Sequence, residues 1–165
     1  MPTTRLLRRV GRMVRGLVHL GPRNATRVVA AWVLLGLSRF AILVLPFSLV
    51  RRALGERRDV GSTGPVAGLD DATSVRAARI AATVALAARH TPWRSECYPQ
   101  ALTARALLGL ARVPHVVSFG VRRVDGDLVA HAWVHAGEVP VTGGTGRSYT
   151  EVGSFAWVPR SARSR

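Results

Sequence analysis

The spacing of hydrophobic residues along this chain changes once, at Val113 and Pro114. Upstream of this point, apolar residues recur every three or four positions, as they do on one face of a helix. Downstream, they alternate with polar residues, as they do in half-buried strands. Because the helices come first and the strands follow as a block, we expect an α+β fold with helices packed on an antiparallel sheet.

The predicted strands are placed by this alternation and by the turns between them. A first strand carries Val117, Phe119 and Val121 on one side, and a VDGD turn at residues 124–127 follows it. A second strand runs from Leu128 to His135 and has two different faces. One face carries Ala130, Ala132 and Val134, and the other carries Val129, His131, Trp133 and His135. A further strand is expected at Glu138 to Thr142, and residues 149–158 are apolar enough to add one short element.

The N-terminal region, residues 1–55, is predicted to be helical, basic and hydrophobic. Residues 6–18 form an amphipathic pattern with arginines on the polar face. Residues 28–47 are apolar on every side and reach the roughly 20 residues that span a bilayer. Arg39 lies near the middle of this run, where an arginine costs roughly 2.5–3.5 kcal/mol on insertion scales. We therefore favour a helix buried against the first one or under a partner, with a single membrane span as the alternative.

The remaining boundaries follow from turn-forming residues and caps. Residues 56–69 are rich in Gly, Ser and Pro and predict a linker. Asp70 or Asp71 can cap a helix that runs to about His90. We assign the compact core to residues 70–158 and expect the tail, residues 159–165, to be disordered.

Positive charge is concentrated in the first third of the chain. Residues 1–58 hold 12 arginines against one acid, Glu56, which gives +11. Residues 59–165 hold 12 arginines against eight acids, which gives +4. Such a basic segment is typical of binding to an anionic membrane or to an acidic protein partner. We do not expect nucleic acid as a partner, because the sequence has no aromatic stacking platform and no zinc-finger spacing.

Cys97 is the only cysteine in the chain, so no intramolecular disulfide can form. Pro99 and the strong helix formers from Gln100 onward place Cys97 at a predicted helix N-terminus. There the positive end of the helix dipole favours a thiolate. The alternative is an inert buried thiol, since unpaired cysteines are among the most buried residues. A lone cysteine also fits a reducing compartment.

His131 lies 34 residues after Cys97, on a predicted strand. A cysteine nucleophile needs an imidazole that takes the thiol proton and later returns one to the leaving amine. A zinc site made of His131 and His135 with Cys97 or Glu138 is disfavoured, because a four-residue offset on a strand separates side chains by roughly 13 Å. The pattern therefore favours cysteine catalysis, and we expect neither a metal nor a cofactor.

Residues 97–144 resemble the transglutaminase-like core of the lasso peptide leader peptidases, the stand-alone second half of the split lasso B protein. In that family a Cys opens a Leu-rich helix, a Pro-containing turn leads to a strand ending in Gly-Val, and an Ala-His-Ala-Trp-Val run follows. Here these features are Cys97, Pro114, Gly120-Val121 and Ala130 to Val134. The likeness extends to the preceding Arg- and Leu-rich helices.

The resemblance implies a papain-like cysteine protease that cuts the leader from a ribosomally made lasso precursor. It implies Cys97 as the nucleophile and His131 as the general base and acid. It also implies two protein partners: a small leader-recognition protein, which is a RiPP recognition element, and an ATP-dependent, asparagine-synthetase-like cyclase. The family places an Asp about a dozen residues after the His, on the next strand, to orient the imidazole.

That third residue is not evident in this sequence. Pairing the strands around Ala136-Gly137 puts Thr142 opposite His131, with Gly143 beside it, and neither is a carboxylate. The Thr142 hydroxyl, a backbone carbonyl or Glu138 could orient the ring instead, and the remaining carboxylate candidates are Asp125, Asp127 and Glu151. For the oxyanion we expect the backbone N–H of Cys97, with the indole N–H of Trp93 as a second candidate.

The sequence thus predicts a cytoplasmic cysteine endopeptidase that acts on a leader peptide held by a second protein. Attachment to the inner face of the membrane stays open. Two alternative functions also stay open. One is an acyl transferase of transglutaminase type that uses the same cysteine and base. The other is a non-catalytic scaffold, bound to the membrane or to the cyclase, in which Cys97 is merely buried.

Overall fold

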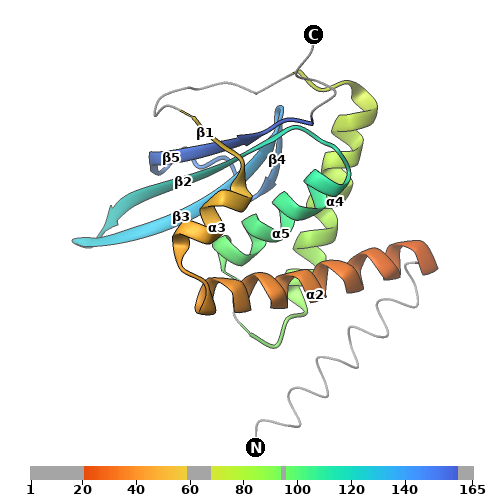
Figure 1. Cartoon of the computed structure of the whole chain (residues 1–165), viewed down its shortest axis with the longest axis horizontal. Coiled ribbons are helices and arrows are strands. Elements are labelled where there is room, and N and C mark those ends of the chain that lie inside the picture. Colours follow the sequence, from red (N-terminus) through yellow and green to blue (C-terminus); the bar gives the residue numbers. More distant parts are fainter. Residues whose placement is uncertain (1–20, 59–67, 94–95, 160–165) are drawn as a thin grey trace, which may run out of the picture.

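The computed structural model describes residues 21–58, 68–93 and 96–159. Helices cover one face of a five-stranded antiparallel sheet (Figure 1). This arrangement confirms the α+β fold expected from the single change in hydrophobic spacing. The amphipathic helix predicted at residues 6–18 and the tail predicted after Pro159 lie outside the described residues.

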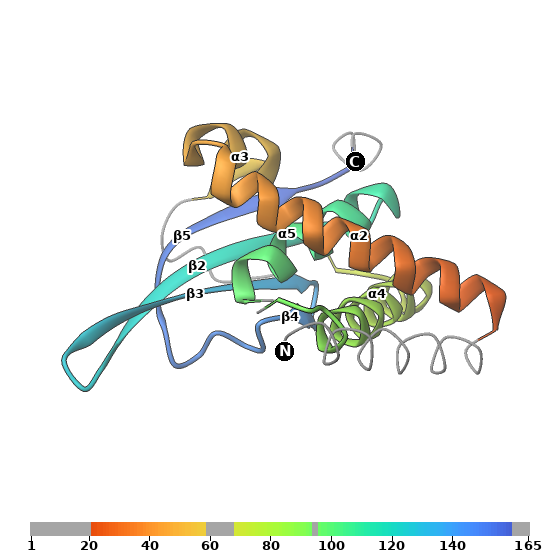
Figure 2. The same ribbon diagram turned by 90° about the horizontal axis from the view of Figure 1, so that it is seen from below.

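Two helices come from the N-terminal region. Helix α2 (Pro22–Val44) begins with a proline at its first position and ends before Pro46. A backbone N–H at that first position would have no hydrogen-bond partner within the helix, so proline costs nothing there. Helix α3 (Phe47–Leu54) follows and ends at Gly55. Figure 2 shows α2 lying across the outside of the other helices.

One face of α2 is buried, and its neighbours are the two later helices; the helix at residues 6–18, against which we expected it to pack, lies outside the described residues. Val28, Ala31 and Leu35 of α2 form a small cluster with Ala87 of helix α4 (Asp71–Arg89). The Ser38 hydroxyl lies 3.2 Å from that of Thr103 in helix α5 (Cys97–Leu110). The hydrophobic run is therefore anchored to the rest of the molecule along one side only.

Helix α4 begins where the sequence predicted. Asp70 is its N-cap, and the carboxylate accepts a hydrogen bond of 2.7 Å from the backbone N–H of Thr73. This hydrogen bond lowers the pKa of Asp70. The helix runs to Arg89, one residue before the expected end at His90.

The sheet contains the strands expected from the alternating half of the chain. They are β2 (His115–Val124), β3 (Asp127–Ala136), β4 (Val139–Thr142) and β5 (Thr150–Trp157), and with β1 (Glu56–Arg58) their order is β1-β5-β2-β3-β4. The VDGD turn joins β2 to β3 as predicted, with φ of 51° at Asp125 and 92° at Gly126. Positive φ at both central residues is what a tight two-residue hairpin turn requires.

The predicted linker is wrong for its first three residues, because residues 56–58 form β1. This strand pairs with β5 at the edge of the sheet, with Arg57 opposite Phe155. Gly55, with φ of 125°, allows this pairing, since a Cβ there would collide with the carbonyl oxygen of Ala156. The edge of the sheet is thus built from residues that the sequence assigned to a flexible connection.

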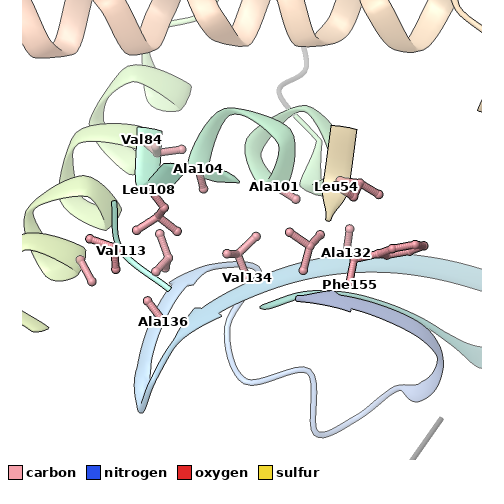
Figure 3. Packing of buried hydrophobic residues seen from close by; sticks show 13 residues of the cluster. Leu54, Val84, Ala101, Ala104, Leu108, Val113, Ala132, Val134, Ala136 and Phe155 are labelled. Carbon is pink, nitrogen blue, oxygen red and sulfur yellow. The ribbon is translucent and has the colours of Figure 1, made fainter. Parts of the chain in front are cut away.

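The main core lies between the sheet and helices α4 and α5 (Figure 3). It consists of small and branched apolar side chains: Leu54, Ala77, Val84, Ala101, Ala104, Leu108, Val113, Val117, Ala132, Val134, Ala136, Val141 and Phe155. Ala101 and Ala104 on α5 meet Ala132 and Val134 on β3, and small side chains allow a helix to approach a sheet closely. The face of β3 that carries Ala132 and Val134 is therefore the face covered by α5.

Candidate active site

Cys97 is the first residue of α5, so the predicted position at a helix N-terminus is correct. Its thiol is free and half-buried, and it packs at the margin of the main core. Cys97 shares one side of the helix with Ala101, Ala104 and Leu108, since these residues are separated by three or four positions. That side faces the sheet, and the thiol therefore lies between the start of α5 and the strands beneath it.

His131 lies on β3 and is held by a backbone carbonyl. Its Nε2 is 2.8 Å from the carbonyl oxygen of Gly143. Because a carbonyl can only accept, Nε2 carries a proton and donates it. The neutral ring then has its lone pair on Nδ1, which is the atom left to act as a base.

The His131 ring is one of three stacked aromatic rings. It lies 4.6 Å from the ring of Tyr149 with an interplanar angle of 23°, and 6.1 Å from Trp133 with an angle of 21°. Trp133 is only 5 % exposed, because the loop of residues 143–149 covers it. Gly146 packs on the indole so closely that a Cβ there would overlap it. The glycine-rich loop thus closes over this stack.

The stack and Cys97 lie on opposite faces of β3. Side chains alternate along a strand, so His131 and Trp133 point away from the face where Ala132 and Val134 meet α5. Figure 3 shows the loop after β4 on the side of the sheet away from the helices. Within the described part of the chain, no hydrogen bond joins the Cys97 thiol to the His131 ring. The two predicted catalytic side chains are therefore carried by adjoining elements but lie on opposite faces of β3.

His131 lies beside a free edge of the sheet. Strand β4 pairs with β3 only from Val134 to Ala136, so the part of β3 that contains His131 has a neighbour on the β2 side alone. The carbonyl of Gly143, just after the end of β4, holds the ring next to this edge. No strand pairs with β3 at His131 on this side, but the backbone of Gly143 packs closely against Ala132 and Trp133 there, so the loop after β4 covers this unpaired edge.

The predicted pairing of Thr142 with His131 is wrong. Thr142 lies opposite Val134, because the tight turn is centred on Gly137-Glu138 and the register shifts again between Val134 and His135. The Thr142 hydroxyl is buried and has no hydrogen-bond partner among the described residues. The group that orients His131 is instead the backbone carbonyl of Gly143, which was one of the alternatives.

Glu138, the other candidate for the third position, lies at the β3–β4 turn near His135. Its negative charge raises the pKa of His135, although burial has the larger effect and lowers it. Glu151 shares a row across the sheet with Gly120 and His131. The Trp133 ring lies over Gly120 and fills the space in that row. Within the described residues, neither carboxylate forms a hydrogen bond or an ion pair with the imidazole, whose one hydrogen bond goes to the Gly143 carbonyl.

Trp93, the second oxyanion candidate, packs against α2. Its ring lies 5.4 Å from that of Trp32, and a Cβ added at Gly36 would lie 3.4 Å from it. The indole N–H is buried and makes no hydrogen bond to any residue the structure describes. Since α2 lies beyond α5 as seen from the sheet, the indole is engaged in the contact between helices.

Two residues near His131 were not identified from the sequence. Tyr149 stacks on the imidazole, and the guanidinium of Arg122 lies 4.8 Å from the centre of the Tyr149 ring. The sequence feature that could have indicated the Tyr149 contact is the GGTG run at residues 143–146. Such a run before an aromatic residue lets a loop fold onto a flat side chain.

The sequence matches a known protein family. The model of a transglutaminase-like superfamily domain matches residues 41–154, which include α3, strands β1 to β4, the first part of β5, and both Cys97 and His131. No curated protein and no solved structure matches the chain.

Proposed function

Because the chain belongs to the transglutaminase-like superfamily, we propose that it is a cysteine endopeptidase that removes the leader from a ribosomally synthesised lasso precursor. Cys97 is the nucleophile in this proposal, and His131 is the general base and acid. The observation that carries it is the position of the only cysteine at the start of α5, on the side that packs on the strand bearing His131. Superfamily membership makes an enzyme that uses a cysteine plausible.

The proposed reaction has two stages. First, Nδ1 of His131 takes the thiol proton, since Nε2 keeps its own proton in the bond to Gly143. The sulfur attacks the scissile carbonyl carbon, and the backbone N–H of Cys97 donates to the oxyanion. The imidazolium returns the proton to the leaving amine, and the core peptide departs with a free amino terminus. Water then cleaves the thioester, which releases the leader carboxylate and restores the thiol.

This reaction requires a movement of the imidazole. His131 points away from the face of β3 that α5 covers, so a rearrangement of β3 or of the start of α5 must bring its ring and the thiol together. Among the described residues, the ring nitrogens have one hydrogen bond, to Gly143, and the stacking partner Tyr149 lies in the loop between β4 and β5. We assign this closure to the state in which the precursor is bound.

The proposal includes the two partners implied by the resemblance, a leader-recognition protein and a lasso cyclase. The compact core is small and leaves little room for substrate subsites, so a second protein that presents the leader would raise its effective concentration at Cys97. A cytoplasmic location goes with this proposal, since the free thiol suits a reducing compartment.

The test is cleavage of a lasso precursor by the purified full chain together with the leader-recognition protein. Mass spectrometry should find the leader ending in a free carboxylate. Cys97→Ala should abolish cleavage and leave precursor binding unchanged, whereas Leu110→Ala, on an exposed side chain of the same helix, should cleave normally. Cleavage that persists in Cys97→Ala would rule out the peptidase.

The same assay separates the two alternative functions. An added primary amine competes with water for the thioester, so a leader recovered mainly as its amide would identify an acyl transferase. A wild-type chain that binds the cyclase and never modifies the precursor would support the scaffold, in which Cys97 is only a packing residue.

A further inference from the structure

Helix α2 has an apolar face that nothing in the described structure covers. Apart from Leu43, its exposed large hydrophobic side chains recur every three or four positions and lie opposite the buried ones. We name this set the α2 outer face: Val29, Val33, Leu37, Phe40 and Val44, with exposed fractions from 42 % to 64 %. The exposed apolar surface continues past the end of the helix through Leu45 and Leu49. Contiguous exposed apolar surface of this kind marks a binding face.

The helix is also long and apolar enough to cross a membrane. Its most apolar 18-residue stretch, within Asn24–Val44, has a mean hydropathy of 1.9, and only 17 % of that stretch is buried. A span would nevertheless have to leave the molecule. It would break the contact of Ser38 with Thr103, separate Trp32 from Trp93, and expose the buried side of the helix. A helix that lies flat in the membrane interface keeps all of these contacts.

The arginines near the α2 outer face indicate what kind of surface it binds. Exposed arginines lie at both ends of this apolar stretch in the sequence: Arg27, which also borders the groove between α2 and α4, precedes Val29, and Arg51 and Arg52 on α3 follow Leu49. The first 58 residues hold 12 arginines and a single acid. An apolar helix face bordered by arginines is the pattern of an amphipathic segment held at an anionic bilayer. Most protein partners would not supply an extended apolar layer and a dense negative charge together.

We propose that the α2 outer face binds the surface of a bilayer containing anionic lipids, with α2 parallel to the membrane plane. The apolar side chains enter the boundary between headgroups and acyl chains, and the flanking arginines contact lipid phosphates. The opposite side of α2 stays packed on α4 and α5. This inference does not depend on the proposed peptidase function.

Vesicle flotation of the full chain tests the proposal. The chain should float with protein-free vesicles of phosphatidylcholine mixed with phosphatidylglycerol, and less with phosphatidylcholine alone. Added salt should weaken the binding. The double variant Leu37→Ser/Phe40→Ser should lower the partition coefficient at least about tenfold, since it removes two large apolar side chains from the interface. Arg51→Gln/Arg52→Gln should lower it on anionic vesicles only.

Leu110→Ser is the matched control, because Leu110 is 80 % exposed but lies at the end of α5 and not on α2. It should bind vesicles as the wild type does. Thermal unfolding should be unchanged in each variant, since the substituted side chains are exposed. Failure to bind protein-free vesicles, or equal binding by the Leu37→Ser/Phe40→Ser variant, would overturn the proposal and favour a protein partner.

Alkaline carbonate distinguishes a flat helix from a span. Carbonate strips proteins from the membrane surface and leaves spanning helices in place. Membranes of cells that express the full chain should release it in this wash. Retention in the washed membranes would show that α2 crosses the bilayer and would contradict the proposed orientation.

Discussion

His131 donates its Nε2 proton to the carbonyl oxygen of Gly143 over 2.8 Å. A backbone carbonyl therefore has the position in which the sequence resemblance led us to expect a carboxylate. It fixes the tautomer of the ring as a carboxylate would, and it leaves Nδ1 free to accept a proton. It brings no negative charge, so it stabilises an imidazolium less than an aspartate would.

Gly143 should tolerate no side chain. Its φ is 74°, and a Cβ would lie 2.7 Å from Cβ of Trp133 and against the carbonyl oxygen of Ala132. Gly143→Ala should lower the free energy of unfolding by roughly 2–5 kcal/mol, the sum of about 1–2 for the left-handed conformation and about 1–3 for overpacking. Denaturant titration measures this loss.

Gly144 provides the matched control, since its φ is 68° but a Cβ there would meet nothing within 4 Å. Gly144→Ala should lose only the conformational part, about 1–2 kcal/mol. Equal losses for the two variants would show that the close approach of Gly143 to β3 is not real. If the prediction holds, an aspartate introduced at position 143 cannot supply the missing carboxylate without displacing the loop.

Trp93 should be dispensable for the chemistry. Its indole packs on Trp32, and its N–H makes no hydrogen bond to any described residue. Trp93→Phe keeps a ring in the contact with α2 and removes an unpaired donor, so the cleavage rate should change less than about threefold. A donor to the oxyanion would cost about a hundredfold or more when removed. Single-turnover cleavage of the precursor therefore separates the two roles.

His115 should make the fold sensitive to acid. The side chain is 1 % exposed, its Nδ1 donates to the carbonyl of Val113, and Nε2 is buried with no partner among the described residues. Burial lowers its pKa to about 4, and the nearby positive charge of Arg105 acts in the same direction. Protonation would place an N–H without an acceptor in the core.

The sign of the effect follows from where the protons bind. Below about pH 6.5 the unfolded chain takes up a proton at His115 that the folded chain refuses until about pH 4. As the pH is lowered from about 6.5 to about 4, the free energy of unfolding should therefore fall by on the order of 3 kcal/mol. His115→Gln should flatten this slope, measured by urea unfolding at several pH values. An unchanged slope would mean that another group is responsible, such as His135, whose pKa burial also lowers.

The strands and their two faces could be predicted because alternation is a local property of the sequence. Ala132 and Val134 face the core, and His131 and Trp133 face the other way, as the pattern at residues 128–135 indicated. Which of the two faces of β3 lies next to Cys97 could not be predicted in the same way. Alternation shows that two faces exist, but only the packing of α5 decides which face it covers.

The partner of His131 depended on the turn geometry. A turn centred one residue later, at Gly137-Glu138, together with a bulge, moves Thr142 from His131 to Val134. Such shifts depend on backbone conformation and on the fit of several strands, and the residue types alone do not reveal them. For the same reason, β1 was missed: three residues at a sheet edge form a strand only because β5 is there to pair with them.

The central claim, that His131 activates Cys97, is tested most directly by the rate at which iodoacetamide alkylates the thiol in the presence of the leader-recognition protein and the isolated leader peptide, the state to which the closure is assigned. Cys97 is the only cysteine, so the reaction reports on a single site. The account predicts that His131→Gln, which can still donate to Gly143, slows alkylation near neutral pH by at least about tenfold. Rate profiles that superimpose for the wild type and His131→Gln would contradict it.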